Sequence, residues 1–162
     1  MALVDTPVPS ATLSPMTRSR AEVLTRIREA DYRKMLKQNE LFREKGTGNF
    51  RDLMIGVAQD PAMLAFLDAG VNVKGAPNEN FAREIMELFS MGVGNYTETD
   101  IREAARCFTG WEVRRQKFYL NERQFDLGEK TVFGRAGKFG GEDVVRVILE
   151  QPATPRFLAR KL

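Results

Sequence analysis

The sequence predicts a mainly α-helical fold: a multi-helix globular domain with a small β insert at about residues 111–133. Apolar residues recur every three or four positions through most of the chain, which is typical of amphipathic helices. Several of these stretches follow residues that commonly cap helices, namely Asn49, Asp60, Asn78 and Thr97. Within 111–133 the apolar residues are scattered among charges and turn residues, which indicates two or three short strands.

Each helix is expected from its own apolar stripe and its end signals. The first stripe allows one helix or two with a break near Asn39, and Thr97-Glu98-Thr99-Asp100 resembles a capping box with Asp in the place of Glu or Gln. The helix after Asn78 is expected to bury Phe81, Ile85, Leu88 and Phe89. Loops are expected at Ala69 to Pro77 and at the glycine-rich Gly134 to Gly141. The remaining helices are expected at Arg18 to Lys45, after Asn49, after Asp60-Pro61, after Thr97, at Gly141 to Glu150 and from Thr154-Pro155 onward.

The length and composition favour one domain. The chain has 162 residues, of which 43% are hydrophobic, enough for a single core. Residues 1–17 are rich in Pro, Ser and Thr and are expected to form a disordered tail before a helical domain at 18–162. The last helix reaches Leu162 without a C-terminal cap, so we expect a fragment of a larger protein.

Charge and rare residues narrow the classes of function. The net charge is +3, and two basic segments, 18–51 and 105–162, flank an acidic one at 52–104. Basic flanks permit nucleic-acid binding, although attraction between the segments within the fold explains them more simply. The absence of histidine excludes Ser-His-Asp and Cys-His catalysis and histidine-ligated zinc. The one cysteine, Cys107, excludes an intramolecular disulfide and fits a small buried hydrophobe.

Five segments together carry a family resemblance. They are Gly48-Asn49-Phe50-Arg51 with Asp60-Pro61-Ala62-Met63-Leu64, Pro77-Asn78-Glu79-Asn80-Phe81-Ala82-Arg83-Glu84 with Met86-Glu87-Leu88, Tyr96-Thr97-Glu98 through Thr109-Gly110-Trp111, Asp126-Leu127-Gly128-Glu129-Lys130-Thr131, and Arg156-Phe157-Leu158-Ala159-Arg160-Lys161-Leu162. Their order and spacing, from about Gln38 to Leu162, resemble the bacterial domain-of-unknown-function 1800 family. The resemblance implies a large, mainly helical bacterial protein with no activity assigned to its family. It also implies that the gene often lies beside that of another uncharacterised family, many of whose members look exported.

The chain departs from the family pattern in three ways. It is far shorter than a typical member, it lacks the upstream stretch containing aromatic residues and histidine, and Phe125 stands where members tend to have a histidine. Any chemistry that those histidines perform in relatives is therefore not expected here. We expect a truncated product, an internal piece or a degenerate copy.

One candidate site is a polar cluster on the helix after Asn78. Carboxylates that share a helix face can bind Mg²⁺ or Ca²⁺, or can divide acid and base roles. The simpler interpretation is that Asn78 caps the helix and Arg83 pairs with the glutamates at i,i+4 spacing. No cofactor is predicted beyond a divalent cation as the weaker alternative. The cluster comprises Asn78, Glu79, Asn80, Arg83, Glu84 and Glu87 from this helix, together with Asp126 and Lys130 from a later turn.

The turn between Asp126 and Lys130 is the second candidate. Glu129 separates Gly128 from Lys130, so the segment does not match a phosphate-binding Gly-Lys-Thr loop. Asp126 could join the glutamates in a metal-assisted hydrolase. The aromatic residues Phe108, Trp111, Phe118 and Tyr119 are expected in the core rather than as a stacking platform, and the basic run Arg114 to Lys117 as a solvated strand edge.

The favoured function is a non-catalytic helical interaction or scaffold domain. Its candidate interaction edge is Phe157, Leu158 and Leu162, and its partner would be the remainder of a larger parent protein or another protein, including the product of a neighbouring gene. A fragment of a metal-assisted hydrolase and a nucleic-acid-binding domain are the alternatives. No membrane span or signal peptide is found, so the cytoplasm is expected unless a parent protein carries a signal.

Overall fold

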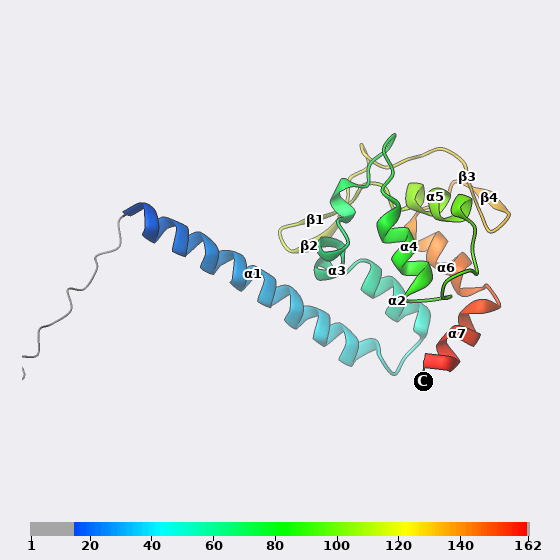
Figure 1. Ribbon diagram of the computed structural model, residues 1–162, viewed down its shortest axis with the longest axis horizontal. Helices are drawn as coiled ribbons and strands as arrows, with labels where there is room; N and C mark the ends of the chain where they lie inside the picture. The colour runs from blue at the N-terminus through cyan, green and yellow to red at the C-terminus, as the bar shows by residue number, and fades with distance from the viewer. Residues whose placement is uncertain (1–14, 162) are drawn as a thin grey trace, which may run out of the picture.

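A mainly helical body is joined to one long helix that extends away from it (Figure 1). The computed structural model describes the backbone of residues 15–161 and the side chains from Arg28 onward. These residues form seven α-helices, one short 3-10 helix and two two-stranded antiparallel sheets, which confirms the predicted fold class. The expected disordered tail lies outside the described residues, except for residues 15–17, which belong to the first helix.

Helix α1, Pro15–Lys45, is one continuous helix with no break at Asn39. Its C-terminal half packs along α2, Phe50–Ala58, and α3, Pro61–Phe66, while its N-terminal half projects from the body (Figure 1). The predicted caps of α2 and α3 are confirmed. The Asn49 side chain accepts a hydrogen bond from the backbone N–H of Arg51, and Asp60 accepts two such bonds at the start of α3. A 3-10 turn, η1 at Ala69–Val71, follows in the expected loop.

Helices α4, Glu79–Glu87, and α5, Glu98–Cys107, pack against each other in the centre of the body. The predicted capping box of α5 is confirmed, because Thr97 and Asp100 each accept a hydrogen bond from the other's backbone N–H. The predicted burial of Leu88 is wrong. Helix α4 ends one residue before it, and the chain turns so that Met91 enters the core while Leu88 faces solvent.

Two β-hairpins follow α5. The first pairs β1, Trp111–Arg114, with β2, Lys117–Leu120, and the second pairs β3, Lys130–Val132, with β4, Arg135–Gly137. Each hairpin turns through two residues with positive φ, which is the backbone of a type I′ turn. The basic run is therefore a hairpin turn together with the strand ends beside it, rather than a strand edge alone. Strand β4 also occupies part of the expected glycine-rich loop.

The last two helices are α6, Gly141–Leu149, and α7, Ala153–Lys161. Thr154 does not cap α7 as predicted. It lies inside the helix, and its buried hydroxyl donates a hydrogen bond of 2.7 Å to the backbone oxygen of Ile148. Among the described residues, no helix combines the length and the apolar character needed to cross a membrane.

A row of four aromatic rings runs through the core. The rings of Phe81, Phe108, Trp111 and Phe118 follow one another at centroid distances of 5.0 to 5.1 Å, each pair edge to face. This placement confirms the prediction for Phe108 and Trp111, whereas Tyr119 is exposed and lies beneath the guanidinium of Arg114. Gly141 begins α6 against this core, and a Cβ there would lie 2.2 Å from the Trp111 ring, so only glycine allows the close approach.

Candidate functional site

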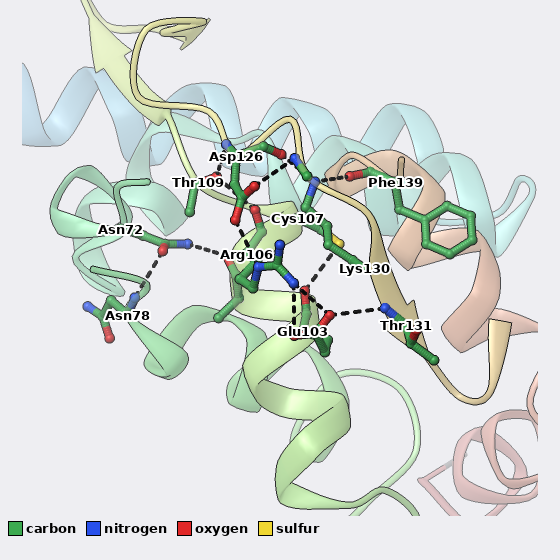
Figure 2. Close-up of polar contacts among 12 residues, drawn as sticks. Asn72, Asn78, Glu103, Arg106, Cys107, Thr109, Asp126, Lys130, Thr131 and Phe139 are labelled. Carbon is green, nitrogen blue, oxygen red and sulfur yellow. Dashed lines mark hydrogen bonds and ion pairs between the residues drawn. The ribbon is translucent and has the colours of Figure 1, made fainter. Parts of the chain in front are cut away.

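A polar network around Arg106 joins α5 to the chain that leads into β3 (Figure 2). Arg106 Nε donates a hydrogen bond of 2.8 Å to Asp126, and its Nη1 donates to both carboxylate oxygens of Glu103. The bond from Arg106 holds the pKa of Asp126 below its ordinary range, and the same pair raises the pKa of Arg106. Both groups are therefore charged at neutral pH. Glu103 also accepts a bond of 3.0 Å from the backbone N–H of Thr131, which attaches β3 to α5.

Lys130 is almost wholly buried beside this ion network, with 1% of its surface exposed. Its ammonium donates to the backbone oxygens of Asp126 and Phe139, the latter at 3.0 Å (Figure 2). It also lies 4.8 Å from the centre of the Phe125 ring. Burial lowers the pKa of Lys130. The two carbonyl acceptors compensate the loss of water, so Lys130 ties the turn after Asp126 to the loop before α6.

The remaining polar groups of this network are also satisfied. Thr109 accepts a bond of 2.8 Å from the Asp126 backbone N–H, and Asn72 connects the Ala105 oxygen of α5 to the Asn78 backbone N–H at the start of α4. Cys107 is fully buried, as predicted, and burial raises the pKa of its thiol to about 12. Such a thiol is protonated at neutral pH and is a poor nucleophile.

A second, more exposed network surrounds Arg83 on α4. Arg83 pairs with Glu98 at 2.7 Å, with Glu79 at 3.3 Å and with Glu87 at 3.6 Å. The bond to Glu98 contributes most to the raised pKa of Arg83, and burial together with the bond to Glu87 raises the pKa of Tyr96 to about 12. The arginine thus neutralises the glutamates that a cation would need.

The predicted cluster residues fall into these two networks. Asn78 caps α4, Asn80 donates a bond of 3.4 Å to the Leu67 oxygen, and half-buried Glu84 makes no ion pair with a described residue. Asp126 and Lys130 belong to the Arg106 network, and neither makes a hydrogen bond or an ion pair to a described residue of α4. Among the described side chains, no three histidine, cysteine or acidic residues converge in a manner that could hold a metal ion.

The surface beside α7 is the third candidate. Phe157 and Leu158 are half-buried, and the Phe157 ring lies over Gly92, where a Cβ would stand 2.8 Å from it. Leu162 lies outside the described residues. Phe157 forms one wall of an open hollow of about 650 Å³ between α7 and the turn after α4. Three cations, Arg156, Arg160 and Lys161, line this hollow, and none of its described lining residues is acidic.

Sequence reasoning missed most of the Arg106 network. Arg106 and Asp126 are twenty residues apart, and Glu103 reaches a strand twenty-eight residues further along the chain. A helical pattern reveals only neighbours three or four positions apart, so the Glu103–Arg106 pair was the one available signal. The same reasoning missed the cations around Phe157 as a set, although Arg156 and Arg160 have helical spacing.

The two ion networks are suited to holding the fold together. Within the described residues, every buried side-chain nitrogen and oxygen has a hydrogen-bond partner. A catalytic group needs a free lone pair or proton facing a space that a substrate can enter. The polar groups of the Arg106 network are taken up by one another, and Arg83 already pairs with Glu79, Glu87 and Glu98, whereas the hollow beside α7 offers cations with no carboxylate partner among the described residues.

Comparison with known proteins agrees with the resemblance found in the sequence. The family model described as "Protein of unknown function (DUF1800)" matches residues 22–162, so the similarity begins before Gln38 and includes much of α1. No curated protein and no solved structure matches the chain significantly. The match covers well over half of the sequence, and the chain therefore belongs to the DUF1800 family, whose description assigns no biochemical function.

Proposed function

We propose that the chain is a non-catalytic interaction domain that binds an acidic segment of a partner protein in the hollow beside α7. The observation that carries the proposal is the lining of the hollow, where three cations surround an apolar wall and no acidic side chain stands among the lining residues that the structure describes. Arg156, Arg160 and Lys161 make no ion pair with a described residue. Their charges are therefore available to a ligand.

The apolar wall favours a peptide over a nucleic acid. Met91, Val93 and Phe157 line the hollow together with the cations, so a peptide that alternates acidic and apolar residues would satisfy both parts. A nucleic acid would use the cations, but its phosphates would gain nothing from this wall except through base stacking on Phe157. An acidic peptide with apolar residues is therefore favoured, because its charges complement the cations and its apolar side chains can cover the apolar wall.

Fluorescence anisotropy with two labelled peptides of equal negative charge would test the proposal. One peptide combines Glu with Leu and Phe, and the other combines Glu with Ser. The first should bind more tightly, and the double variant Arg156→Glu/Arg160→Glu should weaken its binding by about tenfold or more. The control is Arg115→Glu/Lys117→Glu, which changes the net charge equally at the tip of the first hairpin.

Three results would contradict the proposal. They are the absence of binding, equal loss in the control variant, and tighter binding of a single-stranded oligonucleotide with the same charge. The last result would favour the nucleic-acid alternative. Circular dichroism of both double variants would verify that each remains folded.

A further inference from the structure

Helix α1 has one face that packs on the body. Gln38 donates a hydrogen bond of 2.8 Å to Asp60, the residue that caps α3. Leu41 lies against Gly56 of α2, where a Cβ would stand 2.9 Å from its methyl group. Lys45 lies against the same glycine at 3.5 Å. With about 100° of rotation per residue, these contacts share one side of α1.

The opposite side of α1 is apolar but uncovered by any described residue. Tyr32, Met35, Leu36 and Phe42 are between 45% and 65% exposed. Figure 1 shows α2 and α3 along the other side of the helix. Large apolar side chains gathered on one exposed helix face mark an interaction surface rather than isolated surface residues. We call Arg28, Tyr32, Met35, Leu36, Asn39 and Phe42 the outer stripe.

The spacing of the outer stripe is that of a coiled coil. Arg28, Tyr32, Met35, Asn39 and Phe42 are separated by four, three, four and three residues, which is the alternation of a and d positions in heptads. From this spacing we propose that two copies of the chain pair through the outer stripes of their α1 helices, antiparallel, about a twofold axis near Lys37. The pairing is separate from the hollow beside α7 and goes beyond the proposed function.

The charges beside the stripe select a second copy as the occupant. In an antiparallel pair, the residues along one border of the apolar stripe face the residues along the same border of the partner helix. Glu29, Leu36 and Arg43 lie along one such border at intervals of seven residues. The twofold axis then places Glu29 opposite Arg43 of the second copy, twice, with Leu36 opposite itself. Within the described side chains, neither Glu29 nor Arg43 makes an ion pair.

The same residues disfavour a parallel pair. Parallel helices in register would place Arg28 against Arg28, and the charged edge residues would lose their complementary partners. In the antiparallel pair Tyr32 faces Phe42, Met35 faces Asn39, and Arg28 lies beyond the end of the other helix. Asn39 is the weak position of this interface, because its amide enters an otherwise apolar layer.

Sedimentation over a wide range of concentrations, using the full chain, would test the pairing. The chain should pass from monomer to dimer as its concentration rises. Tyr32→Glu should raise the dimer Kd by about a hundredfold, and Asn39→Leu should lower it by about tenfold. Both residues are exposed in the monomer, so unchanged circular dichroism would verify that the variants fold. A monomer at every concentration, or an unchanged Kd for Tyr32→Glu, would overturn the proposal.

A charge exchange tests the orientation. Glu29→Arg and Arg43→Glu should each raise the Kd of their own homodimer by about tenfold, because each places like charges opposite one another. A mixture of the two variants should form a heterodimer as stable as the original homodimer, since every pair is again complementary. In a parallel pair residues 29 and 43 would lie about 21 Å apart, so a mixture that fails to recover would overturn the antiparallel arrangement.

Discussion

Arg83 and Arg106 hold similar sets of carboxylates in different surroundings. Arg83 pairs with three glutamates near the surface. The shortest of these ion pairs is with Glu98, whose side chain is 68% exposed. Arg106 joins Glu103 and Asp126 between α5 and β3, where the Asp126 side chain is only 16% exposed. The pKa of each arginine is raised by its partners. Burial and the distance between the joined segments, rather than the number of ion pairs, should decide how much each network stabilises the fold.

The largest effect is expected from Lys130→Ala, which removes the most buried member of the Arg106 network. The substitution leaves a cavity and two partly buried carbonyl oxygens without their donor. We expect the free energy of unfolding to fall by about 3 kcal/mol. Urea denaturation would measure it, and Lys138→Ala, at an exposed lysine in the same region, serves as the control. A loss no greater than that of Lys138→Ala would show that Lys130 contributes little.

Arg106→Ala should have the next largest effect, a loss of about 2 kcal/mol. Asp126 and Glu103 would remain half-buried without their counter-ion, so the loss includes their uncompensated charge. A double-mutant cycle with Asp126→Asn would isolate the coupling between the two side chains. Additive losses in that cycle would contradict a direct Arg106–Asp126 interaction.

The loss of folding stability at acid pH should depend on Asp126. Its pKa in the folded state is lowered by Arg106, whereas in the unfolded chain it returns to about 4. The stabilisation is therefore complete above about pH 4 and is lost as the pH falls through the folded-state pKa. Asp126→Asn should flatten this part of a denaturation series, and Glu98→Gln should change it less. Equal flattening by the two variants would remove the proposed difference between the networks.

Arg83→Ala should have the smallest effect, a loss of less than about 1 kcal/mol. The ion pairs of Arg83 are open to solvent, so added salt should reduce the loss further. Thermal unfolding at low and high salt would measure it beside Arg106→Ala. A loss for Arg83→Ala that equals or exceeds that for Arg106→Ala would reverse the comparison.

The same contrast explains which polar contacts could be predicted. The Arg83 pairs with Glu79 and Glu87 follow from i,i+4 spacing, and the caps at Asn49, Asp60 and Asn78 follow from their positions before helices. The Glu98 and Asp126 partners come from other elements and require the packed structure. Leu88 shows the limit of periodicity, since the pattern continued although the helix had ended at Glu87.

The sequence by itself determined the helical class, most helix starts, the aromatic core around Phe108 and Trp111, and the family. These features depend on local backbone preferences and on the burial of apolar side chains, which a linear pattern records. Tertiary structure alone decided that Lys130 is buried, that Asp126 belongs with Arg106 rather than with the α4 glutamates, and that the outer stripe of α1 is uncovered. Those outcomes depend on which distant segments meet, because desolvation and ion pairing act between groups that are close in space.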